Sequence, residues 1–171
     1  MNTPQSSVQL EVRSSFEPAA MGQFALRPVG SAFFRAQHAW LQGQMELIEH
    51  MMERADAEVS RADALVQIGH LASNLQVHTQ FEVSILLRSL VADARARLTL
   101  DQLEGEAAAA LAELRSIQRR QAASPLAGGQ TMKELVGVFT RLRDIMRREE
   151  RAVFPSFDRA TYAGASATPA A

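Results

Sequence analysis

The sequence predicts an all-α protein, an antiparallel up-down-up-down four-helix bundle with a flexible N-terminal arm. The first observation is composition: Ala, Leu, Arg, Glu and Gln dominate the middle of the chain, with one Tyr and one Trp, which favours helix over sheet. The second is spacing, because apolar residues recur every three or four positions over four long stretches. The third is size: 171 residues, 47% of them hydrophobic, suit one domain with a sizeable core.

The chain divides into three parts by composition. Residues 1–30 contain Ser, Pro and Gly without a sustained period, so we expect an arm that is partly disordered. Residues 31–157 contain the four periodic stretches and form the bundle. Residues 158–171 are rich in small side chains, and we expect them to form a disordered tail.

Two helices are predicted in the first half of the bundle. The first covers residues 31–56 and places His38 on its apolar stripe. The second covers residues 60–94, where His78 and Glu82 share the inward face with leucines and isoleucines. Because residues four apart lie on the same side of a helix, His78 and Glu82 can turn toward one point in the bundle.

Two further helices follow in the second half. The third covers residues 99–121, and a Pro- and Gly-containing break separates it from the fourth. The fourth covers residues 131–155, with Thr131 and Glu134 expected to form a capping box at its start. Glu149 lies on its apolar stripe, near its end.

Charge and cysteine content exclude several classes of function. The net charge is −1 and the arginines alternate with acidic residues, so we expect no nucleic-acid partner. The chain has no cysteine, which excludes iron–sulfur clusters and thiolate zinc sites. No apolar run approaches the roughly 18 residues of a membrane span, and the first residues do not form a secretory signal. We therefore expect a cytoplasmic protein without a membrane partner.

Four polar residues interrupt the apolar stripes of three predicted helices: His38, His78, Glu82 and Glu149. A charged carboxylate in a core costs several kcal/mol unless it is paired, hydrogen-bonded or bound to a metal. Histidine and carboxylate side chains from facing helices are the usual ligands of metal sites in bundles. The sequence thus predicts that these four residues form one shared polar site, which a metal ion or a hydrogen-bonded network could occupy.

Three patterns lie within roughly residues 31–157: His38-Ala-Trp-Leu41 followed by Met45, the pair His78 and Glu82, and the ending Glu149-Glu150-Arg-Ala-Val-Phe-Pro155. With these patterns the chain resembles the hemerythrin-like (HHE cation-binding) family over this range. This resemblance implies a four-helix bundle with a non-haem di-iron centre, in proteins that bind oxygen, respond to iron or nitric oxide, or help to repair iron centres. It implies that His38 and His78 bind one metal, that Glu82 bridges, and that Glu149 is the fourth-helix carboxylate.

The chain departs from the family pattern at the second metal. Ile145 stands where the family has its fourth-helix histidine, and the third helix has no histidine but a run of alanines, residues 107–110. The remaining set suits one divalent ion of non-haem iron, with Zn or Mn as alternatives, better than two ions. Glu106, Glu150 and His70 are further candidate ligands, and Glu106 is the residue that could complete a second site.

Two functions remain open at this point. The first is a metal-binding protein, a sensor, store or regulatory protein rather than an oxygen carrier. The alternative binds no metal and is a four-helix interaction or regulatory module with a buried His/Glu network. Either could have a protein partner or form a homo-oligomer. The sequence has no nucleophile elbow or phosphate loop, so no catalytic residue is predicted, and oxygen-dependent chemistry at a single iron is the only enzymatic route that it allows.

Overall fold

The fold was analysed in a computed structural model, which describes residues 30–54, 58–123 and 128–166. All regular structure in these ranges is helical, which confirms the all-α fold class. No helix in these ranges is both long enough and apolar enough to cross a membrane. The helices are α1 (Ser31–Glu53), α2 (Glu58–Ser89), α3 (Ala94–Ala123), α4 (Gly128–Ala152) and α5 (Phe154–Ser166).

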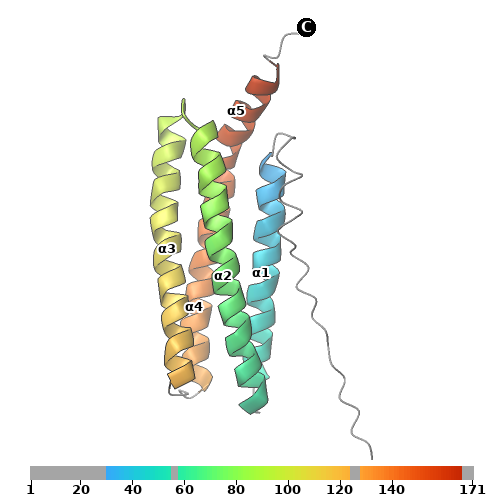
Figure 1. Cartoon of the computed structure of the whole chain (residues 1–171), viewed down its shortest axis with the longest axis vertical. Coiled ribbons are helices and arrows are strands. Elements are labelled where there is room, and N and C mark those ends of the chain that lie inside the picture. Colours follow the sequence, from blue (N-terminus) through green and yellow to red (C-terminus); the bar gives the residue numbers. More distant parts are fainter. Residues whose placement is uncertain (1–29, 55–57, 124–127, 167–171) are drawn as a thin grey trace, which may run out of the picture.

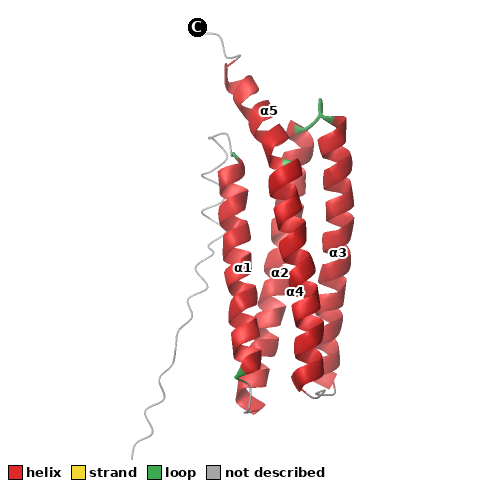
Figure 2. Ribbon diagram, turned by 180° about the vertical axis from the view of Figure 1, so that it is seen from behind, coloured by secondary structure: helices red, strands yellow, loops and turns green. Residues whose placement is uncertain are grey.

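The first four helices lie side by side, and the fifth continues beyond one end of the bundle (Figure 1). The colours of Figure 1 show that successive helices run in opposite directions. Each helix packs against its two neighbours around the bundle, so that α1 contacts α2 and α4, and α3 contacts α2 and α4. Seen from behind, α5 leaves the axis of α4 at an angle near the start of α1 (Figure 2), and it packs against α1, α2 and α4.

The core consists of two apolar clusters. The four polar residues of the predicted site lie between these clusters. Along α1, Phe34 belongs to one cluster and Leu41 to the other, with His38 between them. Along α2, Leu75 and Leu86 belong to the two clusters, and His78 and Glu82 lie between. A polar layer therefore crosses a bundle that is apolar above and below it.

The boundary between α2 and α3 differs from the predicted one. The sequence predicted a second helix to residue 94 and a third from residue 99, whereas α2 ends at Ser89 and α3 begins at Ala94. The reason is Asp93, whose Oδ1 accepts a hydrogen bond from the backbone N–H of Ala96 at 2.9 Å. This N-cap starts α3 earlier than the apolar periodicity indicated.

The capping box predicted for the fourth helix is wrong. Helix α4 begins at Gly128, so Thr131 lies inside the helix, where it is buried and its Oγ1 has no hydrogen-bond partner. The Glu134 carboxylate accepts hydrogen bonds from Arg120 and Gln130 instead of capping the helix.

The predicted tail contains a helix. Residues 158–166 were expected to be disordered, but they belong to α5. Pro155 lies in the first turn of α5, where its missing N–H costs no helical hydrogen bond. Phe157 is buried in the core, and the Asp158 carboxylate accepts hydrogen bonds from the backbone N–H and hydroxyl of Ser31, at 2.9 and 2.6 Å. Residues 1–29 of the predicted arm and the last five residues of the chain lie outside the described residues.

Candidate metal centre

Three helices bring the four predicted ligands together at the polar layer. His38 comes from α1, His78 and Glu82 from α2, and Glu149 from α4. Their exposed fractions are 0%, 8%, 2% and 7%, so all four are buried. A buried ionisable side chain is costly unless a charged or hydrogen-bonding group lies beside it. These four side chains partly serve as such partners for one another.

The ring Nε2 atoms of both histidines lie near the two carboxylates. Nε2 of His78 is 3.0 Å from Oε2 of Glu82, and Nε2 of His38 is 3.7 Å from the same oxygen. Oε2 of Glu149 lies 3.6 Å from Nε2 of His38. His38, His78 and Glu82 each offer one ligand atom, and these atoms all lie within 4.8 Å of one another. Glu149 lies at the edge of this three-residue cluster.

Both imidazoles are oriented by acceptors on their far side. Nδ1 of His38 lies 2.9 Å from Oε1 of Glu150, and Nδ1 of His78 lies 3.0 Å from Oε1 of Gln37. Because a carboxylate and an amide oxygen only accept hydrogen bonds, each Nδ1 is assigned the donated proton. Both Nε2 atoms are thereby turned to the cluster, which is the arrangement that proteins use to orient metal-binding histidines.

The ending Glu149–Pro155 surrounds His38. Glu150 accepts the His38 hydrogen bond and is itself held by Arg35, whose Nη1 donates to Oε2 at 2.9 Å. The ring of Phe154 stacks on the His38 ring, with 5.6 Å between centroids and 22° between planes. The Arg35 guanidinium lies over the same Phe154 ring, 5.3 Å from its centroid. The short motif thus fixes the position of the α1 histidine from a different helix.

The ionisable groups shift one another's pKa values. Burial raises the pKa of Glu149 to about 8, and the neighbouring Glu82 charge adds to this rise. Burial opposes the charged forms of His38 and Glu82 as well. For both residues the charged neighbours outweigh the effect of burial. The carboxylates of Glu82, Glu150 and Glu149 raise the pKa of His38, and the two histidines lower the pKa of Glu82. Without a cation, the site therefore holds one ionised carboxylate and one protonated one near neutral pH.

The residues fit a single metal ion. Nε2 of His38 and Oε1 of Glu82 are buried and have no hydrogen-bond partner, although such orphaned polar atoms are costly in a core. Both belong to the three-residue cluster, and both are ligand atoms for iron, zinc or manganese. A divalent cation would satisfy these atoms and would also relieve the repulsion between Glu82 and Glu149.

The further candidate ligands lie outside this cluster. Glu150 faces Nδ1 of His38, on the side of the ring away from Nε2. Glu106 accepts two hydrogen bonds from Arg148, at the surface between α3 and α4. His70 is exposed on α2. Arg148 thus pairs with Glu106 at the surface rather than with the four buried residues.

The sequence did not indicate the roles of three residues at the site: Arg35, Gln37 and Phe154. Gln37 directly precedes His38, so it lies off the apolar stripe that revealed the histidine. Arg35 lies one turn before His38, a spacing that could have indicated a partner for the same carboxylate. Phe154 was noticed as part of the motif, but its contact with another helix has no signal in the local sequence.

Comparison with known proteins gave one finding that agrees with this geometry. The family model described as "Hemerythrin HHE cation binding domain" matches residues 29–165, which include α1 to α4 and nearly all of α5. No curated protein and no solved structure gave a significant match.

Proposed function

The chain belongs to the hemerythrin HHE cation-binding domain family, and on this premise we propose that it binds one divalent metal ion, non-haem iron, at the three-residue cluster. His38 and His78 would bind it through Nε2 and Glu82 through its carboxylate, with Glu149 as the adjacent fourth ligand. The observation that carries the proposal is the pair of buried, unpartnered ligand atoms, Nε2 of His38 and Oε1 of Glu82. Zn(II) and Mn(II) suit the same donors.

Charge balance supports a divalent ion at this place. Two ionised carboxylates from Glu82 and Glu149 neutralise a 2+ ion, so that the filled site carries no net charge in an apolar core. Glu150 and Gln37 hold the Nδ1 protons of the two histidines, which leaves the Nε2 lone pairs for the metal. Phe154 shields one face of His38 from water.

The side chains of α3 and α4 beside the cluster favour one bound ion over two. Ile145 is 5% exposed and packs in the core cluster of Phe34 and Leu86, and Ala107 packs against the same cluster. Neither side chain can bind a metal, and Glu106 is paired with Arg148. An iron bound here would supply redox chemistry at a single centre. We therefore favour a sensor, store or regulatory protein over an oxygen carrier that uses two irons.

Elemental analysis of the tag-free protein tests this proposal. We expect about one metal ion per chain, and we expect His78→Ala and Glu82→Ala to lose it. His70→Ala is the matched control, because His70 lies on the same helix but is exposed, and it should keep the metal. Metal-free protein whose melting temperature does not rise with Fe(II) under anaerobic conditions, Mn(II) or Zn(II) would rule the proposal out, since a ligand of the folded state must stabilise it.

One observation favours a second function, a metal-free interaction or regulatory module. The contacts of His78 with Glu82 and of His38 with Glu150, at 3.0 and 2.9 Å, already link these side chains into a His/Glu network without an ion. Under this alternative, a chelator would change neither the helical content nor the binding of a protein partner. Loss of stability on chelation would exclude it.

A further inference from the structure

A cavity of about 200 Å³ lies next to the metal cluster, between α2, α3 and α4. Its floor is apolar and contains buried core residues of α2 and α4, namely Leu75, Leu142, Ile145 and Met146. One wall is polar, because His78, Glu82 and Glu149 also line it. The cavity thus adjoins the side of the ligand set that faces α3.

The cavity is open to solvent between α2 and α3. Gln80 of α2 and Glu104 and Ala108 of α3 line it and are exposed, so they form its rim. The small alanines of α3 leave this opening, since Ala107 and Ala108 lie where longer side chains would reach across to α2.

The size and the lining define a class of ligand. An apolar cavity of about 150 Å³ holds a benzene ring, so this one has room for a single ring with one substituent. Of the described residues that line it, three are glutamates and none is Lys or Arg. An anion would face carboxylates on two sides, whereas a neutral ring can pack on the apolar floor and place a hydroxyl at the polar wall.

We infer that the cavity between α2, α3 and α4 is a binding site for a small, uncharged, single-ring molecule with one hydrogen-bonding group. The ligand's ring lies against Leu142, Ile145 and Met146, and its polar group reaches the Glu82–Glu149 side. The inference goes beyond metal binding and does not require a bound ion, because the cavity is formed by the protein alone.

Methyl NMR of the full-length protein with phenol as the probe tests this inference. We expect saturable shifts of the Ile145, Leu142 and Met146 methyl signals, with chelator present and, in a parallel series, with Zn(II). Benzoate, which has a similar ring and a negative charge, should bind at least about tenfold more weakly in chelator. No saturable shift, or equal binding of benzoate, would overturn the inference.

Three variants place the ligand in this cavity. Ala107→Leu fills it from the wall and Ala108→Leu from the rim, and each should weaken phenol binding by about tenfold or more. Ala112→Leu is the matched control, an exposed alanine one turn further along α3 that does not line the cavity, and it should bind as the unchanged protein does. If Ala107→Leu does not fold, Ala108→Leu decides alone; undiminished binding in a folded variant contradicts the site.

The two proposals can fail independently. Phenol binding without metal binding would refute only the metal proposal, and metal binding without phenol binding would refute only the proposed cavity site.

Discussion

Replacing Glu149 by glutamine should make the metal-free protein more stable at pH 8 and flatten the pH dependence of its stability. Glu149 is buried beside the ionised Glu82, and its pKa is raised to about 8 from the ordinary 4.5. The folded chain therefore holds a proton on this carboxyl that the unfolded chain releases above pH 4.5. Because the folded state binds more protons in this window, the free energy of unfolding falls as the pH rises from 4.5 to 8.

The size of this effect follows from the shift itself. The difference between about 8 and 4.5 is about 3.5 pH units, and at about 1.4 kcal/mol per unit it corresponds to a loss on the order of 5 kcal/mol. His38 acts in the same direction, since its raised pKa gives stability that is complete below 6.5 and is lost as the pH rises through the folded value. Glu82 acts in the opposite direction, but only at low pH: its lowered pKa gives stability that is present above 4.5 and is lost as the pH falls through the folded value.

Urea unfolding in chelator from pH 5 to pH 8.5, followed by circular dichroism, measures the predicted slope. Glu149→Gln keeps the shape of the protonated carboxyl but cannot ionise, so most of the decline should disappear. Glu53→Gln is the control, because Glu53 is exposed at the end of α1, and it should follow the unchanged protein. A Glu149→Gln curve parallel to that of the unchanged protein, or a variant that is less stable at pH 8, would refute the reasoning.

Three further predictions test the residues around the cluster. Glu150→Gln weakens the orientation of His38 and should lower metal affinity by about 10- to 100-fold, measured by competition with a chelator, whereas unaltered affinity would mean that Glu150 does not position the ring. Phe154→Ala removes a fully buried ring that stacks on His38 and should cost about 3–5 kcal/mol of unfolding free energy in urea; a loss below 1 kcal/mol would contradict this packing. Asp158→Ala removes both hydrogen bonds to Ser31 and should cost about 1 kcal/mol, with hydrogen exchange accelerated at the start of α1, and no change there would show that α5 does not cap this helix.

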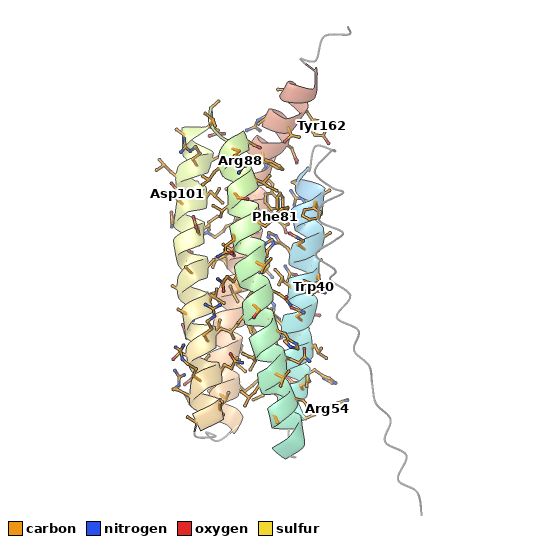
Figure 3. All side chains as sticks on the ribbon, viewed as in Figure 1. Trp40, Arg54, Phe81, Arg88, Asp101 and Tyr162 are labelled. Atoms are coloured by element: carbon orange, nitrogen blue, oxygen red, sulfur yellow. The ribbon has the colours of Figure 1, made fainter. Side chains whose placement is uncertain are left out.

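The fold and most of the site could be predicted because they depend on periodicity. His38, His78, Glu82 and Glu149 lie on apolar stripes, and a polar residue on such a stripe must meet its equivalents on the facing helices. The structure brings these four together as expected, although their binding of a metal stays a prediction. Phe81 of α2, labelled in Figure 3, packs on Phe34 of α1, 6.2 Å away between ring centroids.

The parts that could not be predicted depend on contacts between distant segments or on local capping. Gln37 holds His78 from another helix, 41 residues away along the chain. Helix α5 is stabilised by the burial of Phe157 and by the bonds of Asp158 to Ser31, which is 127 residues away. Neither contact has a local pattern, and a tail of small residues therefore looked disordered. At the start of α3 a single aspartate outweighed the apolar spacing.

The apolar half of the polar layer explains why a divalent cation would stabilise the ligand set. A layer with histidines on every helix could neutralise its carboxylates partly by itself, but here Ile145 and Ala107 turn half of the layer apolar. Glu82 and Glu149 are then left in a low-dielectric core with two imidazoles, and only one carboxylate can be ionised cheaply. Ile145 and Ala107 also line the cavity against that face of the cluster. The apolar half thus both raises the cost of an empty ligand set and gives a small neutral molecule room beside it.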